Sequence, residues 1–358
     1  MAAGAAVRLP GPMNPGPDRA VTIDRLDGVE RTIADWVALQ LAVRAVDAPN
    51  SALPAAARVR GDLEHPWPGA CIEQWLARVD GRLAGILVLG MRLTDNTDIT
   101  VIRELAVHPD YRRQGVGIPL WRHAIAQSLA AGRHRLLVQT TRPLDRDCDP
   151  GEEFVTATGA ARVTMETGHQ LAIADLDKAG LRGRLASAEA ASSDYSLVRW
   201  ADPTPEAFVD GMARMAARMT TDVPMDDLDW QPEVWDAERV RSRDAIAVIR
   251  ETRSYTTAAR HDPTGELAGY TSIDLPAGNH AFGWQEATLV MPGHRGHRLG
   301  LRLKIENLAH VLRHEPALEI VETANADVND HMIAINRVLG FRPVARHSEW
   351  ELKLAGAR

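Results

Sequence analysis

The chain has 358 residues, 45% apolar and 25% charged, so at roughly 150 residues per domain it is long enough for two globular domains and is neither fibrous nor disordered. Its 48 acidic residues outnumber 41 basic ones, and this net charge of -7 argues against nucleic acid as a partner. Two cysteines are too few for a disulfide framework, and no apolar run approaches the ~20 residues of a membrane span, so we expect a cytoplasmic protein without a membrane partner.

The first half of the chain follows a tail, residues 1–17, rich in Ala, Gly and Pro. Apolar periodicity and turn residues then predict a domain over residues 18–178. Its expected elements are strand Val21–Leu26, helix Val29–Val46, hairpin strands Trp75–Val79 and Arg82–Met91, strand Ile99–Val107, helix Gly115–Ala131, strand Arg135–Thr140, helix Glu152–Thr158 and two strands within Arg162–Ala174.

Residues 179–195 have the composition of a linker, although Leu181–Ala191 is also compatible with a short helix. A second domain is expected over residues 196–358, with the same order of elements. These are strand Ser196–Trp200, helices Pro205–Met219 and Glu233–Arg250, a hairpin turning near His261–Gly265, strand Gly283–Met291, helix Arg298–Arg313, strand Leu318–Thr323, helix Asp327–Leu339 and closing strands to Leu354.

An internal repeat supports this division. The tripeptide Leu-Ala-Gly at residues 83–85 recurs at 267–269, an offset of 184, and three further landmarks recur in the same order. They are Gly117 and Gly300, Thr140 and Thr323, and Gly159 and Gly340, at offsets of 183, 183 and 181. The chain is therefore predicted to be α/β, with two copies of one unit, each a mixed, mostly antiparallel twisted sheet flanked by helices.

The most informative motif is a loop between a strand and an apolar helix, and it occurs in both halves. Its glycines permit a tight turn that exposes backbone N–H groups, and a helix start carries a partial positive charge, so the loop suits a pyrophosphate. No Gly-Lys-Ser/Thr or Gly-x-Gly-x-x-Gly is present, which excludes a Walker loop and a dinucleotide fold. The two loops are Arg112-Arg113-Gln114-Gly115-Val116-Gly117 and Arg295-Gly296-His297-Arg298-Leu299-Gly300.

On these loops the chain resembles the GNAT superfamily of N-acyltransferases that use acyl-CoA, in a tandem layout similar to that of mycothiol synthase. The resemblance covers about residues 18–178 and 196–358. It implies that the loop amides bind the pyrophosphate of acetyl-CoA, and that the strand ends near Val107 and Val290 pair with its pantetheine arm. Arg298 departs from the pattern because it stands where the first loop has Gly115.

Acyl transfer to an amine benefits from a base, because an alkylammonium with a pKa near ~10.4 is almost entirely protonated at pH 7. Glu104 occupies a position that is often acidic in the resembled family. The matching residue of the second half is Ala287, and Glu286 would need a β-bulge to take its place. Both glutamates are candidate bases, and the alternative is that each is a surface or structural carboxylate. The tyrosine that often protonates the leaving thiolate is replaced by Val155 and Asn336, so we assign no general acid.

The second half has more of the features expected of an active domain. Asn325, Asn329, Met332 and Asn336 follow helical spacing, and Asn325 and Asn329 are candidate ligands of pantetheine unless they only cap the helix. The first half lacks such amides there, so it is the candidate for a non-catalytic copy that serves a structural role or retains CoA.

An acidic segment that contains Asp226, Asp227 and Trp230 is a candidate site for a cationic substrate, the alternative being a solvated acidic turn. No spacing of His or Cys suggests a metal. We therefore expect an N-acetyltransferase, a monomer or homodimer, that transfers acetyl directly from acetyl-CoA to a primary amine of a small cationic metabolite or antibiotic-like compound. The rival interpretation is a non-catalytic acyl-CoA or ligand-binding regulatory protein.

Overall fold

The computed structural model describes residues 20–354 except 27, 29, 50, 53 and 223–228, and these residues form two compact units. The first comprises residues up to 165, Asp229 and the segment from Arg346 onward; the second comprises residues 166–222 and 230–345. The boundaries of these units differ from the expected 178 and 196, because they fall inside two strands, β6 (Ala161–Ala172) and β12 (Arg342–Lys353). The sequence predicts two strands in each place, but neither segment contains an Asn-Gly or Asp-Gly pair to turn the chain.

The first unit has a mixed sheet in the order β1-β2-β3-β4-β5-β12, in which only β4 and β5 pair in parallel among the pairs β1 to β5. Helices α1 and α2 cover one face and contribute Trp36 and Val59 to its core, while α3 and α4 cover the other with Trp121 and Val155. The bounds are β1 Val21–Arg25, α1 Glu30–Asp47, α2 Ala56–Glu64, β2 Ala70–Val79, β3 Arg82–Arg92, β4 Ile99–Val107, α3 Gly117–Ala130, β5 Arg135–Pro143 and α4 Pro150–Ala157.

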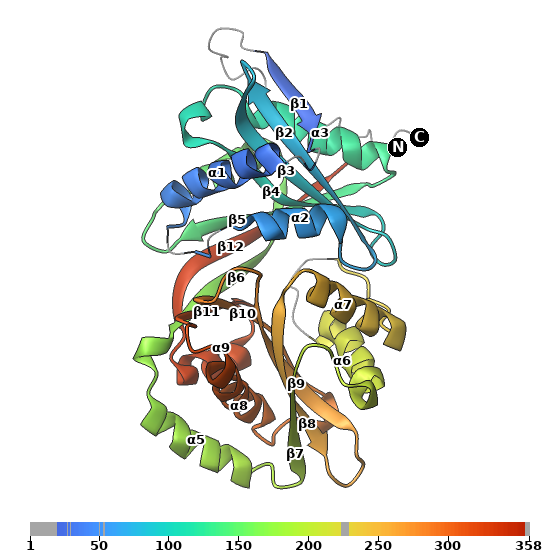
Figure 1. Ribbon diagram of the computed structural model, residues 1–358, viewed down its shortest axis with the longest axis vertical. Helices are drawn as coiled ribbons and strands as arrows, with labels where there is room; N and C mark the ends of the chain where they lie inside the picture. Colours follow the sequence, from blue (N-terminus) through green and yellow to red (C-terminus); the bar gives the residue numbers. More distant parts are fainter. Residues whose placement is uncertain are drawn as a thin grey trace, which may run out of the picture. The chain divides into compact units, whose positions relative to one another are not determined.

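The second unit repeats this arrangement in the order β6-β11-β10-β9-β8-β7, again with one parallel pair, β10 and β11. Helices α6 and α7 lie on one face, and α8 and α9 on the other (Figure 1). The bounds are β7 Tyr195–Ala201, α6 Val209–Asp222, α7 Ala237–Ile249, β8 Arg253–His261, β9 Leu267–Leu275, β10 Phe282–Val290, α8 Leu299–His314, β11 Ile320–Ala326 and α9 Asp330–Leu339. The predicted α/β class with helix-flanked, mostly antiparallel sheets is confirmed.

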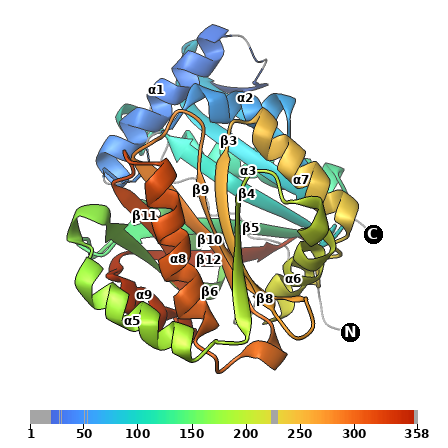
Figure 2. The ribbon, with the colours of Figure 1, turned by 60° about the horizontal axis from the view of Figure 1, so that its bottom comes forward.

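The expected linker is largely the helix α5 (Lys178–Ala190), which begins at an Asp177 cap. Leu181 and Leu185 pack it onto the second unit beside α8 (Figure 2). Its Ala, Ser and Gly content resembles that of a linker, but two leucines four residues apart provide an apolar stripe that the second unit buries.

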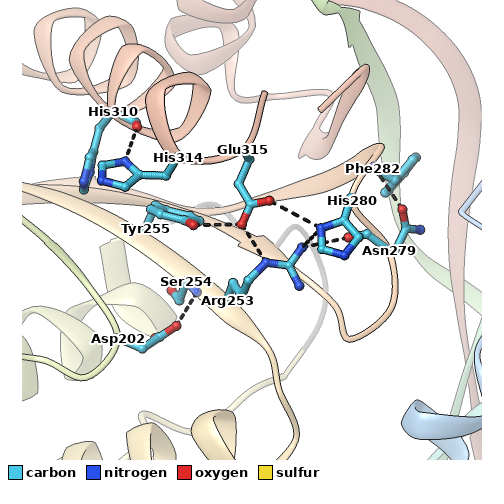
Figure 3. A network of polar contacts seen from close by, with 10 residues as sticks. All are labelled: Asp202, Arg253, Ser254, Tyr255, Asn279, His280, Phe282, His310, His314 and Glu315. Carbon is cyan, nitrogen blue, oxygen red and sulfur yellow. Dashed lines mark hydrogen bonds and ion pairs between the residues drawn. The ribbon is translucent and has the colours of Figure 1, made fainter. Parts of the chain in front are cut away.

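A polar network holds the far end of α8 to the sheet (Figure 3). Glu315, which directly follows α8, accepts hydrogen bonds from Arg253 Nε at 2.6 Å and from the Tyr255 hydroxyl at 2.8 Å. Burial acts to raise the pKa of Glu315, but these hydrogen bonds bring it below its ordinary value. Burial and the same carboxylate raise the pKa of Tyr255 to about 12. The network fixes the helix whose other end begins at the second loop.

Candidate functional site

In both units the parallel pair of strands separates part-way along its length. Strand β4 pairs with β5 only over Ile99–Ile102, although β4 continues to Val107. Strand β10 pairs with β11 only over Phe282–Trp284 and continues to Val290. Beyond these points the N–H and C=O groups on one edge of each strand have no partner in the neighbouring strand, so they can bind an extended ligand that carries amides.

The loops that follow these strands have the same backbone shape in both units. Arg113 and Gly115 have φ of 60° and 84° in the first loop, and Gly296 and Arg298 have φ of 88° and 55° in the second. At an offset of 183, Arg113 matches Gly296 and Gly115 matches Arg298. Each loop therefore has two left-handed residues at the same positions, one glycine and one arginine, in opposite order. Arg298 therefore adopts the turn that its Cβ would disfavour.

The helices that begin at these loops lack side-chain caps. No side chain accepts a hydrogen bond from the first turn of α3 or of α8, whereas α4, α5, α7 and α9 are each capped by an Asp or Asn. A Cβ placed on Gly115 or Gly296 would meet no atom within 4 Å, so neither turn is filled by protein there. Uncapped N–H groups at an open turn are suited to bind an anion.

The first arginine of each loop supports the turn from within the protein. Arg112 Nε donates to the Val107 carbonyl at 3.1 Å, and its two terminal nitrogens bind both carboxylate oxygens of Asp47 at 2.8 and 2.6 Å. Arg295 Nε donates likewise to the Val290 carbonyl at 3.2 Å. These guanidinium groups thus tie each loop to the end of its strand, a role that their place in the motif did not reveal.

A β-bulge places a glutamate near the point where each strand pair separates. In β4 the extra residue precedes Glu104, which accepts a hydrogen bond from Gln40 Nε2 at 2.7 Å; burial raises its pKa. In β10, Glu286 and Ala287 both stand opposite Ser272, so the required bulge is present. Solvent reaches the Glu286 side chain, yet the surrounding protein atoms raise its pKa to about 8.

Comparisons with known proteins agree with this geometry. Residues 44–147 match the acetyltransferase (GNAT) family. The chain is 32% identical to a tandem GNAT protein from the clavulanic acid biosynthesis pathway, with a TM-score of 0.79. The match covers 95% of this chain and 100% of that one. The chain belongs to the GNAT family of acetyltransferases.

Two more distant GNAT structures share the fold. One is a GCN5-related N-acetyltransferase from Sphaerobacter thermophilus, 15% identical with a TM-score of 0.64, covering 95% of this chain and 98% of that one. The other is a glucosamine N-acetyltransferase region in a fungal GH3 β-N-acetylglucosaminidase, 12% identical with a TM-score of 0.66, covering 94% of this chain and 38% of that one. No curated protein matches the chain. The predicted tandem GNAT layout and acyltransferase class are confirmed.

Several of the residues expected to bind acetyl-CoA have structural roles. The side chains of Val116 and Leu299 are buried, so only their backbones face a ligand. Asn329 caps α9 by accepting from Met332 N at 3.2 Å, and Asn325 Oδ1 accepts from Asn336 Nδ2 at 2.6 Å. Seven others of the predicted set are exposed: Arg113, Gln114, Gly115, Arg295, Gly296, His297 and Arg298.

Beside Glu286, on the α6 and α7 face of the second GNAT unit, lies a group of carboxylates that the sequence analysis missed. Asp274 is one strand away, and its Oδ1 is buried without a hydrogen-bond partner. Burial, together with nearby Asp274 and Asp244, raises the pKa of Asp202 to about 6, although a hydrogen bond from Ser254 N and the charge of Arg243 oppose the rise. The surrounding protein atoms and the charge of Asp274 together account for the raised pKa of Glu286.

The acidic segment that the sequence suggests as a substrate site lies largely outside the residues that the structure describes. Asp226 and Asp227 lie outside the described residues, and Trp230 is partly exposed. No group of three His, Cys, Asp or Glu in the described part of the chain is arranged to hold a metal ion. No helix among the residues in view is long and apolar enough to cross a membrane.

Proposed function

We propose that the second unit transfers an acetyl group directly from acetyl-CoA to a primary amine of a small cationic molecule. The observation that carries this proposal is the carboxylate group around Glu286, in which Asp202, Asp244 and Asp274 outnumber the nearby cation Arg243. Like charges in a poorly solvated place raise one another's pKa. A cationic ligand would relieve that repulsion, and an amine is such a ligand.

Glu286 would serve as the base in this reaction. An ammonium with a pKa near ~10.4 must lose its proton before it can attack a thioester, and a carboxylate whose pKa is about 8 accepts that proton more readily than an ordinary one. The amine then attacks the thioester carbonyl in a ternary complex, and the amides on the open edge of β10 are suited to polarise the carbonyl oxygen.

The acetyl-CoA itself would lie along β10, with its pyrophosphate on the loop Arg295–Gly300. The uncapped start of α8 and the open turn at Gly296 support this placement. The first unit has the same loop and separated strands, so it would retain acetyl-CoA. Its bulge glutamate, Glu104, is already engaged by Gln40, which favours a structural rather than a catalytic role.

The test is to measure thiol release from acetyl-CoA with a panel of mono- and polyamines. Glu286→Gln should lower kcat/KM by roughly 10²- to 10⁴-fold and remove an alkaline rise centred near pH 8, because the base acts only when it is deprotonated. The matched variant Glu104→Gln should leave both nearly unchanged. A loss of activity in Glu104→Gln alone would assign catalysis to the first unit, and acetyl-CoA binding without turnover of any amine would favour a ligand-binding protein.

A further inference from the structure

The second unit contains a buried lysine on α8, the helix that begins at the loop proposed to bind the pyrophosphate of acetyl-CoA. Helices α8 and α9 pack on the same face of the sheet (Figure 1), and the two strands that α8 connects, β10 and β11, separate after Trp284. The sequence has only three lysines, and Lys304 on α8 is the one whose side chain is almost entirely buried, at 2% exposure. Lysine is very rarely buried without a partner.

The surroundings of Lys304 give its ammonium no carboxylate. Nζ lies 3.9 Å from the Met332 sulfur on α9 and 5.6 Å from the centre of the Phe341 ring, and it forms no ion pair with any residue that the structure describes. Burial alone lowers its pKa to about 7. The group can therefore give up a proton near neutral pH, which an ordinary lysine cannot do.

A second polar side chain in the same helix interface has one unsatisfied atom. Asn336, one helical turn after Met332, is completely buried; its Nδ2 binds Asn325, but its Oδ1 has no hydrogen-bond partner. An unpaired buried donor or acceptor typically costs about 1 to 3 kcal/mol. A thioether sulfur is a weak acceptor, so a ligand with a stronger acceptor or a negative charge would give the Lys304 ammonium the partner that Met332 does not supply.

The first unit lacks this polar pair. The positions that match Lys304 and Asn336 hold Trp121 and Val155, and both belong to an apolar core cluster. Lys304 and Asn336 therefore occur in the same unit as the carboxylates around Glu286. The fold does not itself require a lysine at this position, because the first unit has Trp121 there.

We propose that Lys304 donates the proton that the thiolate of CoA needs when the acyl group leaves. The proposal rests on the proposed function, and it supplies the general acid that the sequence lacks at position 336. In the step, the C–S bond of the tetrahedral intermediate breaks with its electron pair going to sulfur, and the Lys304 ammonium transfers a proton to that sulfur. The products are CoA thiol, the amide and neutral lysine, which is reprotonated by solvent. The substrate nitrogen loses one proton before attack and a second in the tetrahedral intermediate, and Glu286 passes each of them to solvent in turn.

The test uses free CoA and acetyl-CoA with the full chain, so it does not require the amine to be known. An ammonium at the sulfur should stabilise bound CoA as the thiolate, lowering the thiol pKa from roughly 8.5 by a unit or more, or about tenfold in affinity. We expect wild type at pH 7.5 to show thiolate absorbance on binding CoA, and Lys304→Met to lose it and to bind CoA about tenfold more weakly. Acetyl-CoA has no thiol, so its affinity should be the same in both.

The control is Lys178→Met, which removes an exposed lysine at the start of α5 and should behave as wild type. Unchanged CoA affinity and thiolate absorbance in Lys304→Met, with acetyl-CoA still bound, would overturn the proposal and leave the proposed function standing. Failure of wild type to bind either CoA or acetyl-CoA would overturn both. An equal loss of CoA and acetyl-CoA binding in Lys304→Met would show a structural role and would also overturn it.

Discussion

Lys304→Met should make the protein more stable, and the gain should depend on pH in a defined way. The folded-state pKa of this lysine is lowered from 10.5 to about 7 because the ammonium is buried without a counter-charge. Between these pH values the unfolded chain holds the proton and the folded chain releases it, so wild-type stability rises with pH through this window. Below pH 7 both states are protonated and the full penalty remains.

The size of the effect follows from the same shift. At about 1.36 kcal/mol for each pH unit between 7 and 10.5, the penalty is roughly 5 kcal/mol. Methionine has a similar volume and no charge, so it should recover about 3 to 5 kcal/mol of the free energy of unfolding at pH 6.5 and little of it at pH 10.

Urea titrations of wild type, Lys304→Met and Lys178→Met from pH 6.5 to 10 measure this difference. Subtracting one protein's curve of unfolding free energy against pH from another's removes the contribution of the groups that titrate alike in all three proteins. A constant difference between wild type and Lys304→Met across the whole range would refute the reasoning, because it would show that the ammonium is as well solvated in the folded chain as in the unfolded one.

Three further changes test other parts of the structure. Arg298→Gly should raise the free energy of unfolding by about 1 kcal/mol in a urea titration, because φ of 55° disfavours a residue with a Cβ; a decrease would show that the side chain stabilises the turn. Glu315→Gln should lower it by about 2 to 3 kcal/mol, because the charged partner of Arg253 is lost, and an unchanged melting curve would contradict this. Gly300→Trp should remove one of two acetyl-CoA sites in calorimetry and Gly117→Trp the other; two sites remaining in either would contradict the placement of the loops.

The sequence by itself determined the repeat, the α/β class and the two loops. These features depend on local chemistry: glycines at fixed positions, apolar periodicity and a strand ending before a helix. The offset near 183 even matched the left-handed positions of the two loops, although Arg298 occupies one of them. The sequence also indicated that Glu286 needs a β-bulge to take the place of Ala287, because successive side chains of a strand point to opposite faces of the sheet.

Only the tertiary structure decided which polar groups meet. Asp202 directly follows β7 and is far in the sequence from Asp274 and Glu286, which lie on the paired strands β9 and β10, so nothing local marks Asp202 as their neighbour. The same is true of Lys304, which has the sequence context of an ordinary surface lysine in an amphipathic helix. The packing of α9 against α8 removes it from water, and that long-range contact shifts its pKa and makes the residue available for chemistry.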